Sequence, residues 1–238
     1  MHLHFYKTSV GSCVHGSINS FYLYRMHTWI SQLQAALQGP LPGASAQNMM
    51  SPAGRGNTEE YIQTLTTSPR TSAVMLLIYI EQNIYKMVLI KRTSTPGVHS
   101  GQISFPGGKA EEADLNFEQT ALRETEEEVG VPGKEIQLLG ALSRIYIPPS
   151  NFLVYPFVGF CDHVPAFITS PGEVEKLLLP PVHILLDDSI RKDGIFASGG
   201  QPGWQIEAPY FEIEQEKVWG ATAAILSELK AVITGLIV

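Results

Sequence analysis

The stretch from Gly107 to Val131, GGKAEEADLNFEQTALRETEEEVGV, constrains the fold and the chemistry of this chain more than any other. Two glycines lead into a loop, and the loop leads into a helix. At 3.6 residues per turn, Glu124, Glu127 and Glu128 lie on one face of that helix. The opposite side presents an apolar stripe that can face a core. Its members are Phe117, Ala121, Leu122, Thr125 and Val129.

Neighbouring carboxylates repel one another, at a cost of roughly a few tenths of a kcal/mol per pair. A solvated acidic face is one interpretation of the cluster, since charge runs are usually exposed. A divalent cation held between the carboxylates is the other. The surrounding residues favour the cation. Gly107 and Gly108 precede the helix, Arg123 stands directly before Glu124, and Gly130 follows the last turn.

This frame resembles the Nudix box, Gly-x5-Glu-x7-Arg-Glu-U-x-Glu-Glu-x-Gly-U, in which U is a bulky apolar residue. The segment RETEEEVGV matches the end of the pattern, with Thr125 at the first U. At the front, Asp114 stands in place of the first Glu, and one additional residue separates it from Arg123. The resemblance implies an α/β protein, an α/β/α sandwich around a mixed β-sheet with an N-terminal helix and arm. It also implies a hydrolase that splits the phosphoanhydride of a nucleoside diphosphate derivative.

The resemblance assigns the metal ligands to the Gly107 carbonyl and to the carboxylates of Glu124, Glu127 and Glu128. Mg²⁺ and Mn²⁺ both accept such hard oxygen ligands, and either ion would be the cofactor. Arg123 is expected to orient the glutamates from within the protein.

The partner of Arg123 is expected to be Asp114 or Glu124. Asp114 could instead cap the N-terminus of the helix. The base that activates water is either Glu124 or Glu173, which lies in the segment SPGEVEK. Glu173 could also be a metal ligand or a solvated loop acid, and Glu175 is a weaker candidate.

The segment Leu89–Gly108, LIKRTSTPGVHSGQISFPGG, resembles the signature of the coenzyme A pyrophosphatase subgroup. Arg92 and the FPGG run are in register with that signature, whereas Gly97 occupies the place of its second Arg. The resemblance makes Arg92, Phe105 and Gly108 the expected substrate-binding residues. It favours coenzyme A or a derivative as the substrate, with 4′-phosphopantetheine and 3′,5′-ADP as products.

Three alternatives stay open at this point. The substrate could be ADP-ribose, an NADH-like dinucleotide or another nucleoside diphosphate derivative, because one signature Arg is replaced. The domain could bind nucleotides as a sensor without hydrolysing them. Arg92 could be an ordinary surface charge at a strand end.

The composition fits one domain with an extension. With 238 residues and 44% hydrophobic residues, the chain can build a sizeable core. We expect an extension at 1–25 and a single hydrolase domain at 26–238, with an arm at 26–70 and the Nudix box at 108–131. His2, His4, Cys13 and His15 match no familiar metal-site spacing.

The net charge of −7 offers no electrostatic surface for nucleic acid or an anionic membrane. The longest apolar run, Ala73–Ile80, is too short to span a bilayer, and no secretory signal is visible. Cys13 and Cys161 do not suggest a disulfide framework, so a cytoplasmic location is expected. The family habit and the apolar N-terminal arm suggest a homodimer that takes a small nucleotide as substrate.

Apolar periodicity predicts the remaining elements. A helix is expected from Trp29 to Leu37, and an ordered loop or arm from Leu41 to Arg55. The predicted strands are 73–80 and 84–91, which form a hairpin, then 136–146, 154–161, one from 168 onward, and two within 195–213. A short helix is expected near 183–186 and a last helix at 219–233.

Overall fold

The computed structural model describes residues 28–52, 56–94, 101–197 and 205–236. The extension at 1–25, with His2, His4, Cys13 and His15, lies outside the described residues, as does Gly97. The division into this extension and a domain from residue 26 onward stays a prediction.

A mixed sheet forms the centre of the molecule, and β1 (Arg70–Glu81) is its central strand. β1 pairs in parallel with β8 (Phe152–Cys161) and antiparallel with β2 (Ile84–Met87) and β5 (Gly107–Lys109). β6 (Gln137–Ala141) and β7 (Ile145–Ile147) pair antiparallel with β8. The sheet order is β2-β1-β8-β6, with β5 added to β1 and β7 to β8.

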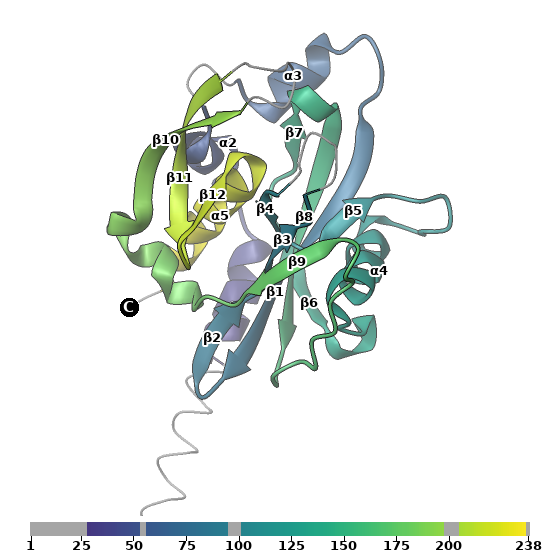
Figure 1. Cartoon of the computed structure of the whole chain (residues 1–238), viewed down its shortest axis with the longest axis vertical. Helices are drawn as coiled ribbons and strands as arrows, with labels where there is room; N and C mark the ends of the chain where they lie inside the picture. The colour runs from purple at the N-terminus through teal and green to yellow at the C-terminus, as the bar shows by residue number, and fades with distance from the viewer. Residues whose placement is uncertain (1–27, 53–55, 95–100, 198–204, 237–238) are drawn as a thin grey trace, which may run out of the picture.

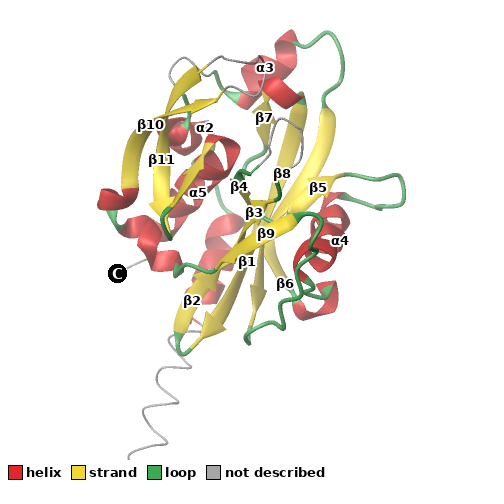
Figure 2. Cartoon of the chain, in the orientation of Figure 1, coloured by secondary structure: helices red, strands yellow, loops and turns green. Residues whose placement is uncertain are grey.

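Both faces of β1 are buried, which explains its continuous apolar run. Side chains alternate along a strand. Met75 and Leu77 therefore pack with Ala121 and Val129 of helix α4 (Phe117–Val129). The alternate residues of β1 pack in a second cluster with residues of helix 28–37 and of α5 (Gly220–Thr234). Helices thus cover both faces, and the predicted α/β/α sandwich is confirmed (Figures 1 and 2).

Two smaller sheets complete the fold. One has the order β4-β3-β9, formed by Ile103–Ser104, Leu89–Arg92 and Val174–Leu178. The other has the order β10-β11-β12, formed by Arg191–Ala197, Gln205–Ile213 and Glu216–Trp219. Short helical segments connect the strands. They are α2 (Ala44–Gln47), η1 (Asn48–Met50), α3 (Thr58–Thr64), η2 (Gly133–Glu135), η3 (Pro148–Ser150), η4 (Val182–Leu186) and η5 (Asp188–Ile190).

Several predicted elements are observed, and some bounds were wrong. The helix at 28–37, the short helix near 183–186 and the last helix are present. The expected strand 84–91 is interrupted at Val88, so that β2 and β3 join different sheets. The expected strand 136–146 is split into β6 and β7, and the strand expected from residue 168 begins only at Val174. β12 was not predicted, and the arm at 41–52 contains α2 and η1.

Within the described ranges, we find no helix that combines the length and the apolar character needed to cross a membrane.

Candidate active site

Helix α4 presents the acidic cluster, and its two ends are well defined. Asn116 is the N-cap, and its side chain accepts a hydrogen bond from the Gln119 amide at 2.9 Å. Gly130 is the C-cap in a left-handed conformation, with a φ of 74°. The suggestion that Asp114 caps the helix is therefore wrong, because Asn116 has that role. The spacing of Asn116 and Gln119 is a capping signal that the sequence contains.

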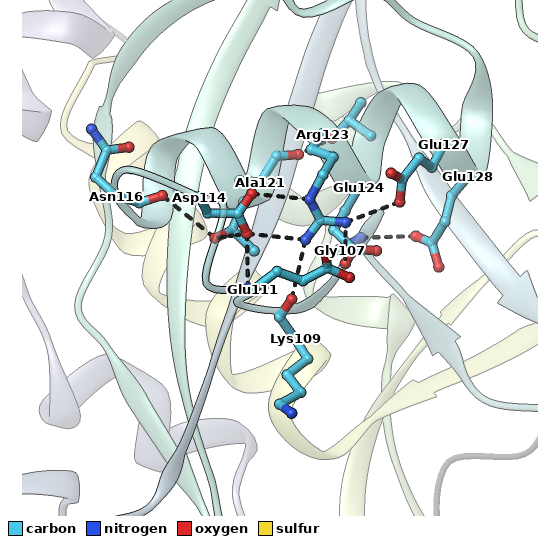
Figure 3. A network of polar contacts seen from close by, with 12 residues as sticks. Gly107, Lys109, Glu111, Asp114, Asn116, Ala121, Arg123, Glu124, Glu127 and Glu128 are labelled. Atoms are coloured by element: carbon cyan, nitrogen blue, oxygen red, sulfur yellow. Dashed lines mark hydrogen bonds and ion pairs between the residues drawn. The ribbon is translucent and has the colours of Figure 1, made fainter.

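Arg123 joins most of the acidic groups of the site (Figure 3). Its Nε and Nη2 atoms donate to the two carboxylate oxygens of Asp114, at 3.0 and 3.1 Å. Its Nη1 lies 2.9 Å from Glu124 and 3.0 Å from Glu127. Nη2 also donates to the Lys109 carbonyl at 3.2 Å. Both of the partners suggested for Arg123, Asp114 and Glu124, are therefore present at once.

The pairing of Arg123 and Asp114 perturbs both groups. The hydrogen bonds from Arg123, and then the one from the Glu111 amide, hold the pKa of Asp114 well below its usual range. The same pair raises the pKa of Arg123. The Asp114 side chain is only 7% exposed. This charge pair fixes the guanidinium where it can hold Glu124 and Glu127.

Glu128 is the most buried carboxylate of the cluster, at 1% exposure. One of its oxygens lies 2.9 Å from Nη1 of Arg92, and the other accepts a hydrogen bond from the Gly107 amide at 2.8 Å. Burial raises the pKa of Glu128 to about 7, against the lowering effects of Arg92 and the Gly107 amide. Arg92, expected to bind substrate, thus contacts an expected metal ligand.

Glu124 lies directly over Gly108. A Cβ atom added at Gly108 would come within 2.5 Å of the Glu124 carboxylate. Burial raises the pKa of Glu124, and Arg123 opposes that shift. Glu127 differs from its neighbours because its side chain is 55% exposed. A side chain at position 108 would therefore displace the Glu124 carboxylate from its present place.

Gly107 is a glycine for a different reason. A Cβ at this position would lie 2.4 Å from the Ala73 carbonyl oxygen of β1. The close pairing of β5 with β1 therefore requires glycine. This packing explains why position 107 has no side chain. The role of the Gly107 carbonyl as a metal ligand stays a prediction.

Glu173 lies in a loop that is fixed to the end of α4. The Ile168 amide donates to the Val129 carbonyl at 2.9 Å, and the Ser170 amide donates to the Glu128 carbonyl at 3.0 Å. Burial is the largest cause of the raised pKa values of Glu124 and Glu128, and the negative charge of Glu173 is a smaller cause of both. The loop thus brings Glu173 within electrostatic range of the helix carboxylates.

Two other candidates have contacts of their own. Glu175 pairs with Lys91, at 3.2 Å. The Phe105 side chain belongs to the main hydrophobic cluster and is 2% exposed. The structure therefore does not support contact between the Phe105 ring and a substrate. The ring contributes to the core just before strand β5.

The oxygen atoms of this site are of the kind that bind a divalent cation. The available ligands are carboxylate and carbonyl oxygens, which Mg²⁺ and Mn²⁺ prefer. Among the described residues, no three Asp, Glu, His or Cys side chains are grouped closely enough, as they stand, to hold an ion. Arg92 contacts Glu128 and Arg123 contacts Glu124, so a cation would compete with the two arginines for these carboxylate oxygens.

The comparison with known proteins settles the family. The NUDIX domain model matches residues 69–197, more than half of the chain. The chain belongs to the Nudix family. A Nudix hydrolase of Photorhabdus laumondii named NudL, described as uncharacterized, is 32% identical over 165 residues, which cover 69% of this chain and 86% of that protein. Chloroplastic Nudix hydrolase 22 of Arabidopsis thaliana is 31% identical over 179 residues, which cover 74% of this chain and 59% of that protein.

Solved structures resemble this Nudix protein only loosely. A Caenorhabditis elegans Ap4A hydrolase aligns with a TM-score of 0.47 and 13% identity, over 70% of this chain and 98% of that one. This similarity says nothing about the substrate of this chain. Family membership makes the chain a Nudix hydrolase, a pyrophosphohydrolase of nucleoside diphosphate derivatives.

Proposed function

We propose that this Nudix hydrolase uses Mg²⁺ or Mn²⁺ to split the phosphoanhydride of coenzyme A or a coenzyme A derivative. The observation that supports this most is the arrangement of Glu124, Glu127 and Glu128 beside Gly107 and Gly108 of β5, with Arg123 holding two of the three. The coenzyme A assignment is supported by the sequence pattern of residues 89–108.

In this reaction a water oxygen attacks one phosphorus of the anhydride, and the bridging P–O bond breaks. A bound Mg²⁺ or Mn²⁺ would neutralise the diphosphate and lower the pKa of the attacking water. Glu124 or Glu173 accepts the proton that water loses. Both are candidates: Glu124 lies over Gly108, and Glu173 lies in the loop that is fixed to the end of α4. Arg123 keeps Glu124 oriented through the attack.

The test compares three glutamates of one helix. Glu124→Gln and Glu128→Gln should each lower kcat for Mg²⁺-dependent hydrolysis of coenzyme A by roughly 10²-fold or more. Glu126→Gln is the matched control, because Glu126 is exposed on the same helix and its carboxylate accepts from the Gly133 amide, at 3.4 Å. The measurement is the release of 4′-phosphopantetheine and 3′,5′-ADP. Near-normal turnover by both variants would overturn the assignment.

A substrate panel separates the alternatives. It contains coenzyme A, ADP-ribose, NADH, diadenosine polyphosphates and nucleotide sugars. Preferential turnover of another member would retain the hydrolase and reject coenzyme A. Tight nucleotide binding without any turnover would identify a sensor. Comparing the pH–rate profiles of Glu124→Gln and Glu173→Gln would then distinguish the base, because only loss of the base removes its acidic limb.

The homodimer and the cytoplasmic location belong to this proposal as well. A monomeric mass in solution would reject the homodimer. We propose no nucleic-acid or membrane partner, in keeping with the net charge of −7.

A further inference from the structure

The β10-β11-β12 sheet has an aromatic face directed away from the core. Phe211 and Val218, a cross-strand pair, are buried in the main hydrophobic cluster. Tyr210 and Trp219 are the next cross-strand pair, so their side chains leave the opposite face of the sheet. Within the described chain, neither core cluster includes Tyr210, Trp219 or Phe196.

We call Phe196, Tyr210 and Trp219 the aromatic platform. The Phe196 and Trp219 rings are stacked, with centroids 4.4 Å apart and planes at 13°. The edge of Tyr210 meets Phe196 at 5.8 Å. Phe196 and Trp219 are both partly exposed, whereas Tyr210 is buried beneath them. A stack of flat rings that solvent still reaches is a surface on which a further flat ring can stack.

A cation lies beside the platform. The Lys217 ammonium is 5.3 Å from the Tyr210 ring centroid and 5.9 Å from that of Phe196, and the side chain is exposed. A lysine ammonium is a good partner for phosphate. Aromatic rings and a neighbouring cation match the two features of a nucleotide, its base and its phosphate. On the same face, Glu212 stands opposite Lys217 and is paired with Lys192, so two lysines face one carboxylate beside the platform.

The sheet that carries the platform is joined to the strands that lead to the candidate active site. β12 packs beside β4, which precedes strand β5 with Gly107 and Gly108 (Figure 1). Thr222, just beyond β12, donates its hydroxyl to the Ile103 carbonyl at 3.0 Å. At the other end of β12, Glu216 lies 3.2 Å from Lys91, whose neighbour Arg92 holds Glu128. Both ends of β12 are therefore tied to strands that lead to the catalytic carboxylates.

We infer that the aromatic platform and Lys217 bind the nucleotide half of the substrate. The base stacks on Phe196 and Trp219, and Lys217 pairs with a phosphate of that half. The inference rests on the proposed function for its nucleotide substrate, but not on which glutamate is the base. It makes these residues determinants of specificity, separate from the carboxylates that carry out hydrolysis.

Two variants test the inference, each with a matched control. Lys217→Ala removes an exposed charge, and Lys134→Ala removes another lysine, on η2. Phe196→Leu removes one ring of the stack. Phe152→Leu removes a ring that also faces a cation, since the Arg70 guanidinium lies 4.1 Å from its centroid. Thermal unfolding of all four variants identifies any loss of fold.

The two halves of coenzyme A serve as separate probes. For Lys217→Ala and Phe196→Leu, we expect KM for coenzyme A and the inhibition constant of 3′,5′-ADP to rise roughly 5-fold or more. The value of kcat should stay within about 2-fold, and the inhibition constant of 4′-phosphopantetheine should be unchanged. The control variants should behave as the wild type.

The outcomes separate this inference from the proposed function. If the wild type hydrolyses coenzyme A and Lys217→Ala leaves KM and 3′,5′-ADP inhibition unchanged, the platform is not the nucleotide subsite. A selective effect on 4′-phosphopantetheine would also overturn it. If the wild type hydrolyses no member of the panel, the proposed function fails, and calorimetric binding of 3′,5′-ADP to wild type and Lys217→Ala still decides the inference.

Discussion

At the scale of single residues, Arg123 organises the acidic helix. One guanidinium meets Asp114, Glu124 and Glu127, so it offsets the repulsion between the two helix carboxylates, Glu124 and Glu127. Asp114 is the partner that carries the pair of parallel hydrogen bonds. This geometry is the strongest form of a charge-assisted contact.

Asp114→Asn should lower the free energy of unfolding by about 2 kcal/mol at pH 7, because it replaces a charged bidentate partner. Urea denaturation of the two proteins measures the difference. The folded-state pKa of Asp114 is lowered, so its contribution is fully present above the unfolded pKa near about 3.9. It is lost as pH falls from there through the folded pKa. The two proteins should converge in stability in that acidic window, and a constant gap would contradict the pairing.

Thr125 tests whether the polar residue in the Nudix box matters. Its side chain is fully buried, and its hydroxyl donates to the Ala121 carbonyl one turn earlier, at 2.6 Å. That carbonyl belongs to the helix, so the contact adds little. Thr125→Val should change the free energy of unfolding by less than about 1 kcal/mol and leave kcat unaltered. A loss well beyond that, seen in chemical denaturation, would mean that the hydroxyl has another role.

At the scale of elements, the two glycines of β5 are needed for different reasons: Gly107 packs against the backbone of β1, and Gly108 faces the Glu124 carboxylate. Gly107→Ala should destabilise the fold by about 3 kcal/mol, because the added Cβ meets backbone atoms of β1. Gly108→Ala should leave stability nearly unchanged and reduce hydrolysis at least 10-fold, because its Cβ displaces only the flexible end of Glu124.

Thermal unfolding and a coenzyme A assay, run on both glycine variants, separate the two effects. Each variant is the control for the other, since they are neighbours in one strand. Equal losses of stability would show that the Glu124 carboxylate cannot move from Gly108.

Local patterns predicted the three longest helices and the central strands, and they failed where backbone partners came from elsewhere. The segment after Ile168 reads as a strand, yet its amides satisfy the last carbonyls of α4. The run 84–91 reads as one strand, yet the Met87 amide donates to Pro180 and the Val88 amide to Leu77. Neither partner can be inferred from the periodicity of the segment itself.

The site shows the same limit. The motif identified the carboxylates and Arg123, because their spacing along one helix fixes their common face. It did not predict that Arg92 would reach Glu128, since the two residues lie 36 positions apart and meet only in the folded chain. Phe105 was expected near substrate for its place in FPGG, and the fold uses it as a core side chain.

At the scale of the whole molecule, Glu228 holds three distant segments together. This carboxylate of α5 has 0% exposure. It accepts hydrogen bonds from the Gly43 amide at 3.0 Å, the Gln47 side chain at 2.9 Å and the Ser143 amide at 3.2 Å. The N-terminal arm and the β6–β7 connection are thereby attached to the last helix. No local pattern around Glu228 predicts this group, because all its partners are far away along the chain.

Glu228→Ala should lower the free energy of unfolding by about 3 kcal/mol or more, because it leaves one buried and two partly buried donors without their acceptor. Glu207→Ala, at an exposed position of β11, is the control and should stay within about 0.5 kcal/mol. Guanidinium denaturation measures both. A small loss for Glu228→Ala would show that water replaces the carboxylate.

The parallel pairing of β1 with β8 has a consequence for how the protein is made. Arg70 pairs with Phe152, so the two strands are separated by roughly 80 residues of chain. During synthesis, β1 leaves the ribosome long before its partner exists, and both of its faces are apolar. Pairings between distant segments form slowly and expose such strands to association with other chains. We therefore expect the nascent chain to need protection by a chaperone until residue 161 has left the ribosome.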